Sequence, residues 1–326
     1  MEARVLKKVV FFALLALSII ACGKKEETKG EAQKETPKET KIKIGITQIV
    51  EHPALDAARK GFMEVLQASE FGSRIEFDEK SAQGDMTVAQ NIANEFVSGK
   101  KNMILAVATP TAQAAYNVTK DIPILITAVT DPVKAGLTGS NITGTSDATP
   151  IDKQFDLLKK IYPNAKKVGI IYNIGEQNSE VQVAQAEEIA KKYGLTVEKV
   201  GISTVNEVAQ AIDALLAKVD VLYTPTDNLV ASAMPLISEK SLAAKKAVIG
   251  AEKGQVESGA LATEGIDYYE LGKQTGQMAL EVLKGAKPNT LPIKTLEKTE
   301  LVINTKIAEK LGLTIPADLL DKATKI

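Results

Sequence analysis

Polar side chains cluster at intervals along the chain, each cluster lying between a short apolar run and a segment with helical spacing of apolar residues. Free N–H groups and the positive end of the dipole at a helix start favour an anion such as a carboxylate. Each cluster alone is also typical of an ordinary helix cap. Their recurrence at nearly every predicted strand end favours a shared site for a small polar molecule. The candidate ligand contacts are Gln48, His52, Gln83, Thr109, Thr111, Thr130, Asp131, Ser146, Asp147, Asn178, Asp227, Asn228 and Glu252.

Residue types needed for catalysis or metal binding are scarce. The chain has one histidine, His52, and one cysteine, Cys22, which cannot supply a metal-ligand set or a Ser-His-Asp arrangement. No G-x-S-x-G elbow, Walker loop or dinucleotide-binding glycine pattern is present. We therefore expect no enzymatic activity, no cofactor and no metal. His52 itself suits a helix cap or a surface position as well as a ligand contact.

Short runs rich in β-branched residues alternate with longer amphipathic segments. Strands are predicted at 41–47, 74–79, 103–108 and 122–127, and again at 167–172, 196–200, 219–223, 247–250 and 260–263. Continuous apolar strands separated by helices are typical of a parallel sheet covered on both faces. Because the strand–helix series occurs twice, the sequence predicts an α/β fold of two doubly wound parallel-sheet lobes with a ligand cleft between them.

The length of the chain also favours two lobes, since the roughly 285 residues after residue 41 exceed the size at which a single hydrophobic core usually stops growing. We expect lobe 1 to comprise 42–147 and 266–296, and lobe 2 to comprise 148–265 and 297–326. The connections between them would form a hinge. Ligands of open α/β sheets bind outside the carboxyl ends of the strands, so the polar clusters should face the cleft.

The N-terminus has the pattern of an export signal. Arg4, Lys7 and Lys8 precede an apolar run that ends in Ile-Ile-Ala-Cys-Gly at Cys22, which resembles a bacterial lipobox. We expect residues 1–21 to be a cleaved lipoprotein signal peptide and Cys22 to be diacylated, because two acyl chains are needed for stable membrane anchoring. Residues 22–41 contain almost no core-forming side chains and are predicted to be a charged tether.

Charge excludes one class of partner. The chain carries 40 Lys and Arg against 41 Asp and Glu, so it lacks the basic excess of a nucleic-acid-binding protein. We expect a monomer on the outer side of the cell membrane, held there by lipid on Cys22, with no nucleic-acid partner.

Seven segments in order along residues 41–326 resemble one family. They read IGITQIVEHPALDAARKGF, SAQGDMTVAQNIA, VATPTAQAA, ITAVTDPVKAGL, TGTSDATPI, YTPTDNLVASAMP and DYYELGKQTG. The chain is similar to ABC-transporter substrate-binding proteins of the tryptophan-binding lipoprotein type. This resemblance implies a type I periplasmic-binding-protein fold, a membrane permease as partner and an aromatic amino acid as ligand. Glu252 stands where a shorter polar residue is expected in relatives, which could shift the ligand.

For such a ligand we expect the two charged ends to be bound by opposite lobes. Thr109, Thr111 and Thr130 are the candidates for the α-carboxylate. Asp227 is the candidate for the α-ammonium, with help from Glu252 or Asp147. A branched-chain amino acid, a purine-like molecule or a sugar remains an alternative ligand, and a lipoprotein that presents its ligand to a sensor remains an alternative function.

Overall fold

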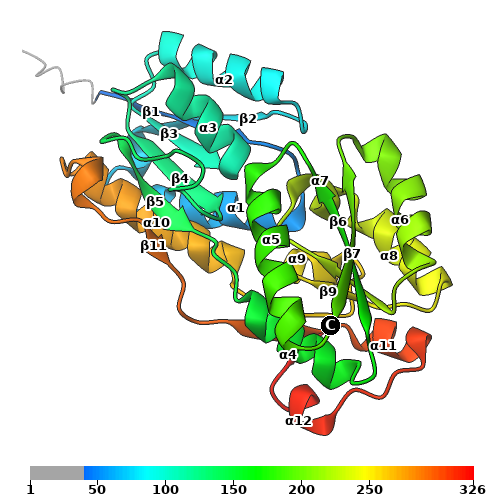
Figure 1. Ribbon diagram of the computed structural model, residues 1–326. Coiled ribbons are helices and arrows are strands. Elements are labelled where there is room, and N and C mark those ends of the chain that lie inside the picture. Colours follow the sequence, from blue (N-terminus) through cyan, green and yellow to red (C-terminus); the bar gives the residue numbers. More distant parts are fainter. Residues whose placement is uncertain (1–39) are drawn as a thin grey trace, which may run out of the picture. The chain divides into compact units, whose positions relative to one another are not determined.

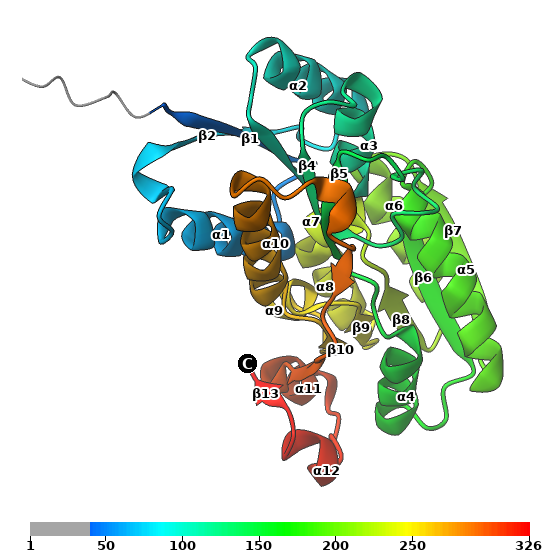
Figure 2. The ribbon, with the colours of Figure 1, turned by 90° about the vertical axis from the view of Figure 1, so that its left-hand side faces the viewer.

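The computed structural model describes residues 40–326, and the predicted signal peptide, Cys22 and the tether up to residue 39 lie outside this range. Two sheets with helices on their faces make up the described part (Figure 1). We call the sheet that contains the first strand, with its helices, lobe 1, and the other sheet with its helices lobe 2. Figure 2 shows the same ribbon turned by 90°.

Lobe 1 is built on a six-stranded sheet in the order β11-β5-β4-β3-β1-β2, with every neighbouring pair parallel. The residues of β3, MILAV, and of β4, ILITAV, are all buried, which explains their continuous apolar sequences. The strands are β1 (Ile42–Gln48), β2 (Ile75–Ser81), β3 (Met103–Val107), β4 (Ile124–Val129), β5 (Ile142–Ser146) and β11 (Lys294–Thr295). The helices are α1 (Pro53–Gln67), α2 (Met86–Ser98), α3 (Thr109–Val118) and α10 (Tyr268–Leu283), with 3-10 turns η1 (Gly72–Arg74) and η3 (Pro288–Thr290).

Lobe 2 repeats this topology in a seven-stranded sheet in the order β13-β12-β10-β9-β8-β6-β7. Its strands are β6 (Lys167–Asn173), β7 (Thr196–Ile202), β8 (Val221–Thr224), β9 (Val248–Gly250), β10 (Ala262–Gly265), β12 (Glu300–Ile303) and β13 (Thr324–Lys325). Its helices are α4 (Ile151–Ile161), α5 (Gln177–Lys192), α6 (Val208–Leu216), α7 (Asn228–Ser232), α8 (Met234–Ala243), α9 (Lys253–Glu257), α11 (Thr305–Leu311) and α12 (Ala317–Leu320), with the 3-10 turn η2 (Val205–Glu207). The predicted α/β class with two lobes is confirmed.

One strand pair departs from the all-parallel expectation, because β10 and β12 are antiparallel. The connections explain this difference. The chain leaves lobe 2 after β10 to form α10 in lobe 1, and it re-enters lobe 2 to form β12. An outgoing and an incoming strand that lie side by side must run in opposite directions. The segments 147–150, 266–267 and 296–299 are the three connections between the lobes within the described range.

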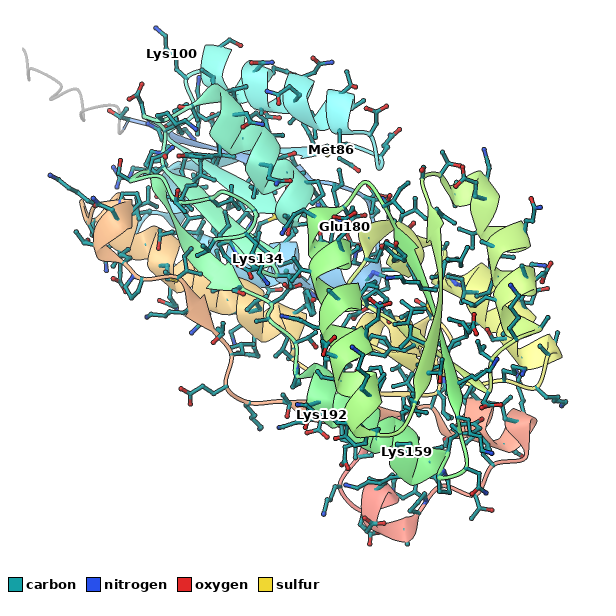
Figure 3. All side chains as sticks on the ribbon, in the orientation of Figure 1. Met86, Lys100, Lys134, Lys159, Glu180 and Lys192 are labelled. Atoms are coloured by element: carbon teal, nitrogen blue, oxygen red, sulfur yellow. The ribbon has the colours of Figure 1, made fainter. Side chains whose placement is uncertain are left out.

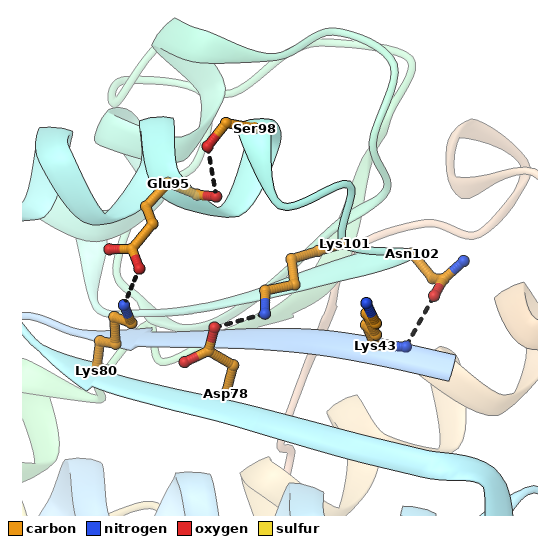
Figure 4. Close-up of polar contacts among 7 residues, drawn as sticks. All are labelled: Lys43, Asp78, Lys80, Glu95, Ser98, Lys101 and Asn102. Carbon is orange, nitrogen blue, oxygen red and sulfur yellow. Dashed lines mark hydrogen bonds and ion pairs between the residues drawn. The ribbon is translucent and has the colours of Figure 1, made fainter. Parts of the chain in front are cut away.

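Charged side chains cover the outer edge of the lobe 1 sheet. The Lys101 Nζ atom lies 2.5 Å from the Asp78 Oδ2 atom, and Lys80 forms an ion pair with Glu95 (Figure 4). Because β2 is an edge strand, these charges discourage pairing with a strand of another molecule. No helix within residues 40–326 is long and apolar enough to cross a membrane.

Helices α1 and α10 lie side by side on one face of the lobe 1 sheet (Figure 2). Their close approach depends on glycine. A Cβ atom at Gly272 would lie 1.9 Å from the Ala58 carbonyl oxygen, and one at Gly61 would lie 2.2 Å from the Tyr269 carbonyl oxygen. The contact fixes the N-terminal ends of both helices, which carry His52 and Tyr268 to the facing lobe.

We predict that Gly272→Ala destabilises the protein by about 1–3 kcal/mol, because the added methyl group must push two backbones apart. Thermal unfolding measures this effect as a lower Tm. Gln277→Ala, at an exposed position of the same helix, should leave the Tm almost unchanged. Equal Tm values for the two variants would show that the close helix contact is not needed.

Candidate ligand site

The carboxyl ends of the two sheets face each other across a cavity lined by both lobes. The side chains that line the cavity almost fill it, leaving a volume of about 10 Å³, enough for about one water molecule. The lining residues of lobe 1 are His52, Ala54, Leu55, Ala128, Asp147 and Tyr268, and those of lobe 2 are Thr226, Asp227, Asn228, Ala231, Glu252 and Gln255.

Helix starts position most of these side chains. Asp227 and Glu252 are the N-cap residues of α7 and α9, and their carboxylates accept hydrogen bonds from the first N–H groups of those helices. Asp267 caps α10 in the same way and so fixes Tyr268 as its first residue. The exception is α1, whose N-cap residue His52 makes no side-chain bond to the helix. The N-terminus of α1 is therefore the one of these four that has no side-chain cap.

Asp147 presents an acceptor without a protein partner. Its Oδ2 atom accepts a hydrogen bond of 2.6 Å from the Tyr268 hydroxyl group. Its Oδ1 atom is buried and has no hydrogen-bond partner among the described residues. Burial raises the pKa of the Asp147 carboxyl group, and the hydrogen bond from Tyr268 opposes this shift. A buried carboxylate oxygen of this kind suits a cationic hydrogen-bond donor.

The pKa values of the two capping carboxylates, Asp227 and Glu252, are also raised. Burial raises the pKa of Glu252 to about 7, and the nearby Asp147 adds to the shift. Burial raises the pKa of Asp227 to about 7 as well, with a contribution from the charge of Glu176. The Asp227 oxygens already accept bonds from the backbone N–H groups of Asn173 and Val230, at 2.5 and 2.9 Å. Both Asp227 oxygens thus have hydrogen-bond donors within lobe 2, whereas one Asp147 oxygen has no partner among the described residues.

A polar contact on lobe 2 was missed by the sequence analysis. Glu176 is buried before α5, and its carboxylate accepts hydrogen bonds from the side chain and backbone N–H of Asn228. Asn228 in turn faces His52 of lobe 1, with 3.4 Å between Asn228 Oδ1 and His52 Nε2. The sequence does carry a signal for Glu176, a carboxylate between a strand and a helix, and the prediction of Asn178 rests on the same pattern two residues later.

A second polar contact joins the lobes beside the cavity. The Gln182 side-chain amide of α5 donates to the Thr130 hydroxyl of lobe 1 at 3.2 Å and to the Thr226 hydroxyl of lobe 2. The Gln182 carbonyl accepts a bond of 3.0 Å from the Thr226 N–H. Thr130 therefore bridges the lobes and does not line the cavity. Nothing in its local sequence pattern distinguishes this position from a ligand contact.

Of the thirteen candidate residues, the structure brings His52, Asp147, Asp227, Asn228 and Glu252 to the cavity wall. The others lie near the cleft or serve local structure. Gln48 donates to Asp56, Thr111 donates to the Val107 carbonyl, Asp131 accepts from the Lys134 N–H, Ser146 donates to the Thr130 carbonyl, and Asn178 donates to the Thr226 carbonyl. Thr109 is buried with its hydroxyl unpaired among the described residues, and Gln83 is exposed.

Backbone strain gathers at the same edge of lobe 1. Ala108 has φ = 83° directly after β3, and Ala128 has φ = 56° near the end of β4, although neither is glycine. Such conformations are costly for residues with a Cβ atom and concentrate at binding sites. Ala128 lines the cavity, so one of these strained residues forms part of its wall.

An outer groove continues the cleft from the cavity towards the surface. Asn228 lines both spaces, and the groove takes its walls from both lobes. Three of its apolar side chains, Met86, Ile174 and Val205, are 45%, 52% and 54% exposed. Figure 3 shows Met86 at the end of α2 nearest lobe 2. Within residues 40–326 no group of three or more His, Cys, Asp or Glu side chains could hold a metal ion.

Two repeated parallel sheets, three connections and an interlobe cavity define a type I periplasmic-binding-protein fold. A family model described as ABC transporter substrate binding protein matches residues 43–326, and the chain belongs to this family. Members of the family are extracytoplasmic solute-binding proteins and not enzymes. The chain is 44% identical to a tyrosine-binding protein of Clostridioides difficile (strain R20291), over 96% of this chain and 93% of that protein.

Two solved structures bear on the arrangement of the lobes. An ABC domain from Streptococcus pneumoniae in complex with L-Trp is 35% identical, with a TM-score of 0.83 over 88% of this chain and 99% of that one. A ligand-free, open substrate-binding protein from Clostridium difficile is 48% identical, but its TM-score is 0.66 over 87% and 99%. The structure described here therefore fits the L-Trp complex better than the open protein, although the open protein has the more similar sequence.

The pKa of Glu252 makes a prediction about pH. A carboxyl group whose pKa rises from 4.5 to about 7 on folding contributes stability that is present below pH 4.5 and lost as the pH rises through 7. We expect the loss from Glu252 to be on the order of 3 kcal/mol. Glu252→Gln should therefore flatten the fall in Tm between pH 5 and pH 8 in the ligand-free protein.

Glu281→Gln, at an exposed position, serves as the control and should retain the full fall. Burial lowers the pKa of His52 to about 4, so His52 contributes stability above pH 6.5 that is lost towards pH 4. This opposite contribution is common to all variants and cancels in the comparison. Identical pH profiles for Glu252→Gln and Glu281→Gln would contradict the prediction.

Proposed function

We propose that this chain binds an aromatic amino acid, tyrosine or tryptophan foremost, and delivers it to the permease of an ABC importer. The observation that carries the proposal is the charge of the cavity wall. Three buried carboxylates, Asp147, Asp227 and Glu252, line the cavity, and its lining residues include no lysine or arginine. A ligand with an ammonium group supplies the missing positive charge. The relatives named for tyrosine and L-Trp support an aromatic side chain.

Asp147 is the best candidate to bind the α-ammonium group. Its Oδ1 atom is buried without a partner among the described residues, and its Oδ2 atom is held by Tyr268. Glu252 lies on the facing lobe and contributes a second carboxylate to the same cavity. Asp227, the sequence-based candidate, accepts two backbone bonds within lobe 2 and is better suited to holding α7 in place.

The N-terminus of α1 is the best candidate to bind the α-carboxylate group. Ala54 and Leu55 in its first turn line the cavity, and the helix starts with Pro53 and has no side-chain cap. Uncapped N–H groups at the start of a 15-residue helix attract an anion. Thr109 and Thr111 do not line the cavity, so they are less suitable than α1.

The apolar part of the wall suits the ligand's side chain. Ala54, Leu55, Ala128, Ala231 and the ring of Tyr268 provide it. Three of these positions are alanines, whose small side chains would limit the wall least if the cavity widens to admit a ring.

We predict that Asp147→Asn weakens amino-acid binding about tenfold or more, because a charged hydrogen bond to the ammonium group is lost. Isothermal titration calorimetry with tyrosine, tryptophan, phenylalanine and leucine measures the effect and ranks the ligands. Asp131→Asn is the matched control, because Asp131 lies after β4 but outside the cavity. Unchanged affinity in Asp147→Asn would remove Asp147 from the binding site.

The chain contains no tryptophan, which gives a direct test of the ligand class. Tryptophan-like emission from the purified protein would have to come from a bound molecule. Mass spectrometry of the material released on denaturation identifies that molecule. Recovery of a sugar or a purine, and of no amino acid, would contradict the proposal.

We further propose that Cys22 is lipidated and anchors the protein to the membrane. Cys22→Ser should abolish acylation and move the protein from the membrane fraction to the soluble fraction. Incorporation of a labelled fatty acid into the two proteins measures the change. Equal labelling and equal membrane retention of both would contradict this assignment.

A further inference from the structure

Three buried polar side chains form a continuous contact from lobe 2 to the cavity. Glu176, Asn228 and His52 are 5%, 6% and 8% exposed. Glu176 precedes α5, Asn228 is the first residue of α7, and His52 precedes α1 on the other lobe. We refer to these three residues as the His52 relay. Two of them, His52 and Asn228, line the ligand cavity.

Glu176 fixes the orientation of the Asn228 side chain. A carboxylate can only accept hydrogen bonds, so the Asn228 amide group turns its Nδ2 atom towards Glu176 Oε2. The same carboxylate also accepts bonds from the backbone N–H groups of Asn228 and Leu229, both at 3.3 Å. These contacts hold Glu176 in place. The Asn228 Oδ1 atom therefore points away from Glu176 and faces His52.

The Asn228 oxygen in turn fixes the tautomer of His52. It accepts only, and it lies 3.4 Å from His52 Nε2, so the network assigns the ring hydrogen to Nε2. Burial lowers the pKa of His52 to about 4, so the ring is neutral at pH 7. A neutral ring with hydrogen on Nε2 carries a lone pair on Nδ1. That Nδ1 atom is buried and has no partner among the described residues.

We propose that the His52 relay makes His52 Nδ1 a selectivity-determining acceptor that favours ligands with a donor on the side-chain ring, a phenol O–H or an indole N–H, over phenylalanine. The inference rests on the function proposed above. An uncharged acceptor matches an uncharged donor, whereas the ammonium group is better served by the carboxylates of Asp147 and Glu252. A ligand without a ring donor leaves Nδ1 unpaired, and sites built on a hydrogen bond reject such analogues.

Glu176 is a positioning residue in this scheme, because it acts on the ligand only through Asn228 and His52. Glutamine at position 176 can donate as well as accept. It would allow the Asn228 amide to turn over and present Nδ2 to His52, which would move the ring hydrogen to Nδ1. The acceptor would then become a donor, and the preference for a ring donor would be lost.

The first experiment determines the tautomer. His52 is the only histidine in the chain, so protein labelled with ¹⁵N-histidine gives a single side-chain spin system that needs no assignment. In the ligand-free protein at pH 7 we expect hydrogen on Nε2 only. Glu176→Gln should show a mixture of tautomers or hydrogen on Nδ1. Glu180→Gln, an exposed position on α5, is the matched control and should match the unmodified protein.

The second experiment measures the ratio of affinities for tyrosine and phenylalanine by calorimetry. We expect a preference for tyrosine of about ten- to a hundredfold, the usual effect of one unpaired buried polar group. His52→Phe, which keeps a ring but removes the acceptor, and Glu176→Gln should both lower this ratio towards one. Glu180→Gln should leave the ratio unchanged.

Each outcome decides one question. Equal affinity of the unmodified protein for tyrosine and phenylalanine overturns the inference but leaves the proposed function standing. An unchanged ratio in His52→Phe, or hydrogen on Nδ1 in the unmodified protein, overturns it as well. If His52→Phe fails to fold, the tautomer and the ratio in Glu176→Gln still decide. If no aromatic amino acid binds although the Nε2–H tautomer is present, the proposed function itself is wrong.

Discussion

The main constraint on this protein is the burial of several carboxylates where two lobes meet. Asp147 raises the pKa of Glu252, and Glu176 does the same for Asp227. Taking such groups out of water is unfavourable unless a positive charge or hydrogen-bond donors compensate. Helix N-termini supply part of the compensation, since Asp227 and Glu252 cap α7 and α9. Under the proposed function, a bound ligand with a positive charge supplies the rest of the compensation. Ligand binding would then favour the arrangement in which the lobes bury these carboxylates.

The proposed function requires the lobes to move apart and together again, and the contacts between them bear on this movement. Beside the packing of α1 against α9, polar contacts cross the cleft: Thr130 with Gln182 and Thr226, and His52 with Asn228. Contacts of this kind gain little over water, so they set the geometry of closure without making it irreversible. The larger hydrophobic clusters lie within each lobe and need not change when the lobes separate. A ligand that favours the closed arrangement therefore has only a small free-energy difference to overcome.

The fold was predictable because periodicity reports local burial. The apolar runs of β3 and β4 and the repeated strand–helix series were enough to predict two parallel sheets. The antiparallel β10–β12 pair was not predicted, because its direction depends on how the chain returns between the lobes. The site was less predictable. A polar residue after a strand has the same sequence signal whether it bonds its own loop, as Asp131 does, or lines a cavity, as Asp147 does. Thr130 and Gln182 meet only through the closure of two lobes, which no local pattern encodes.

His52 illustrates how burial in the cleft decides whether a side chain is charged. A protonated His52 would be a natural counter-ion for the surrounding carboxylates, and the cavity would then have little need of a cationic ligand. Burial lowers the pKa of His52 to about 4, so at neutral pH the ring carries no charge. The same burial raises the pKa values of Asp147, Asp227 and Glu252, but it leaves them acceptors for an ammonium group. Desolvation thus removes the protein's own cation from the site. Under the proposed function the ligand supplies the positive charge, and under the further inference Glu176, through Asn228, leaves the neutral ring with an acceptor.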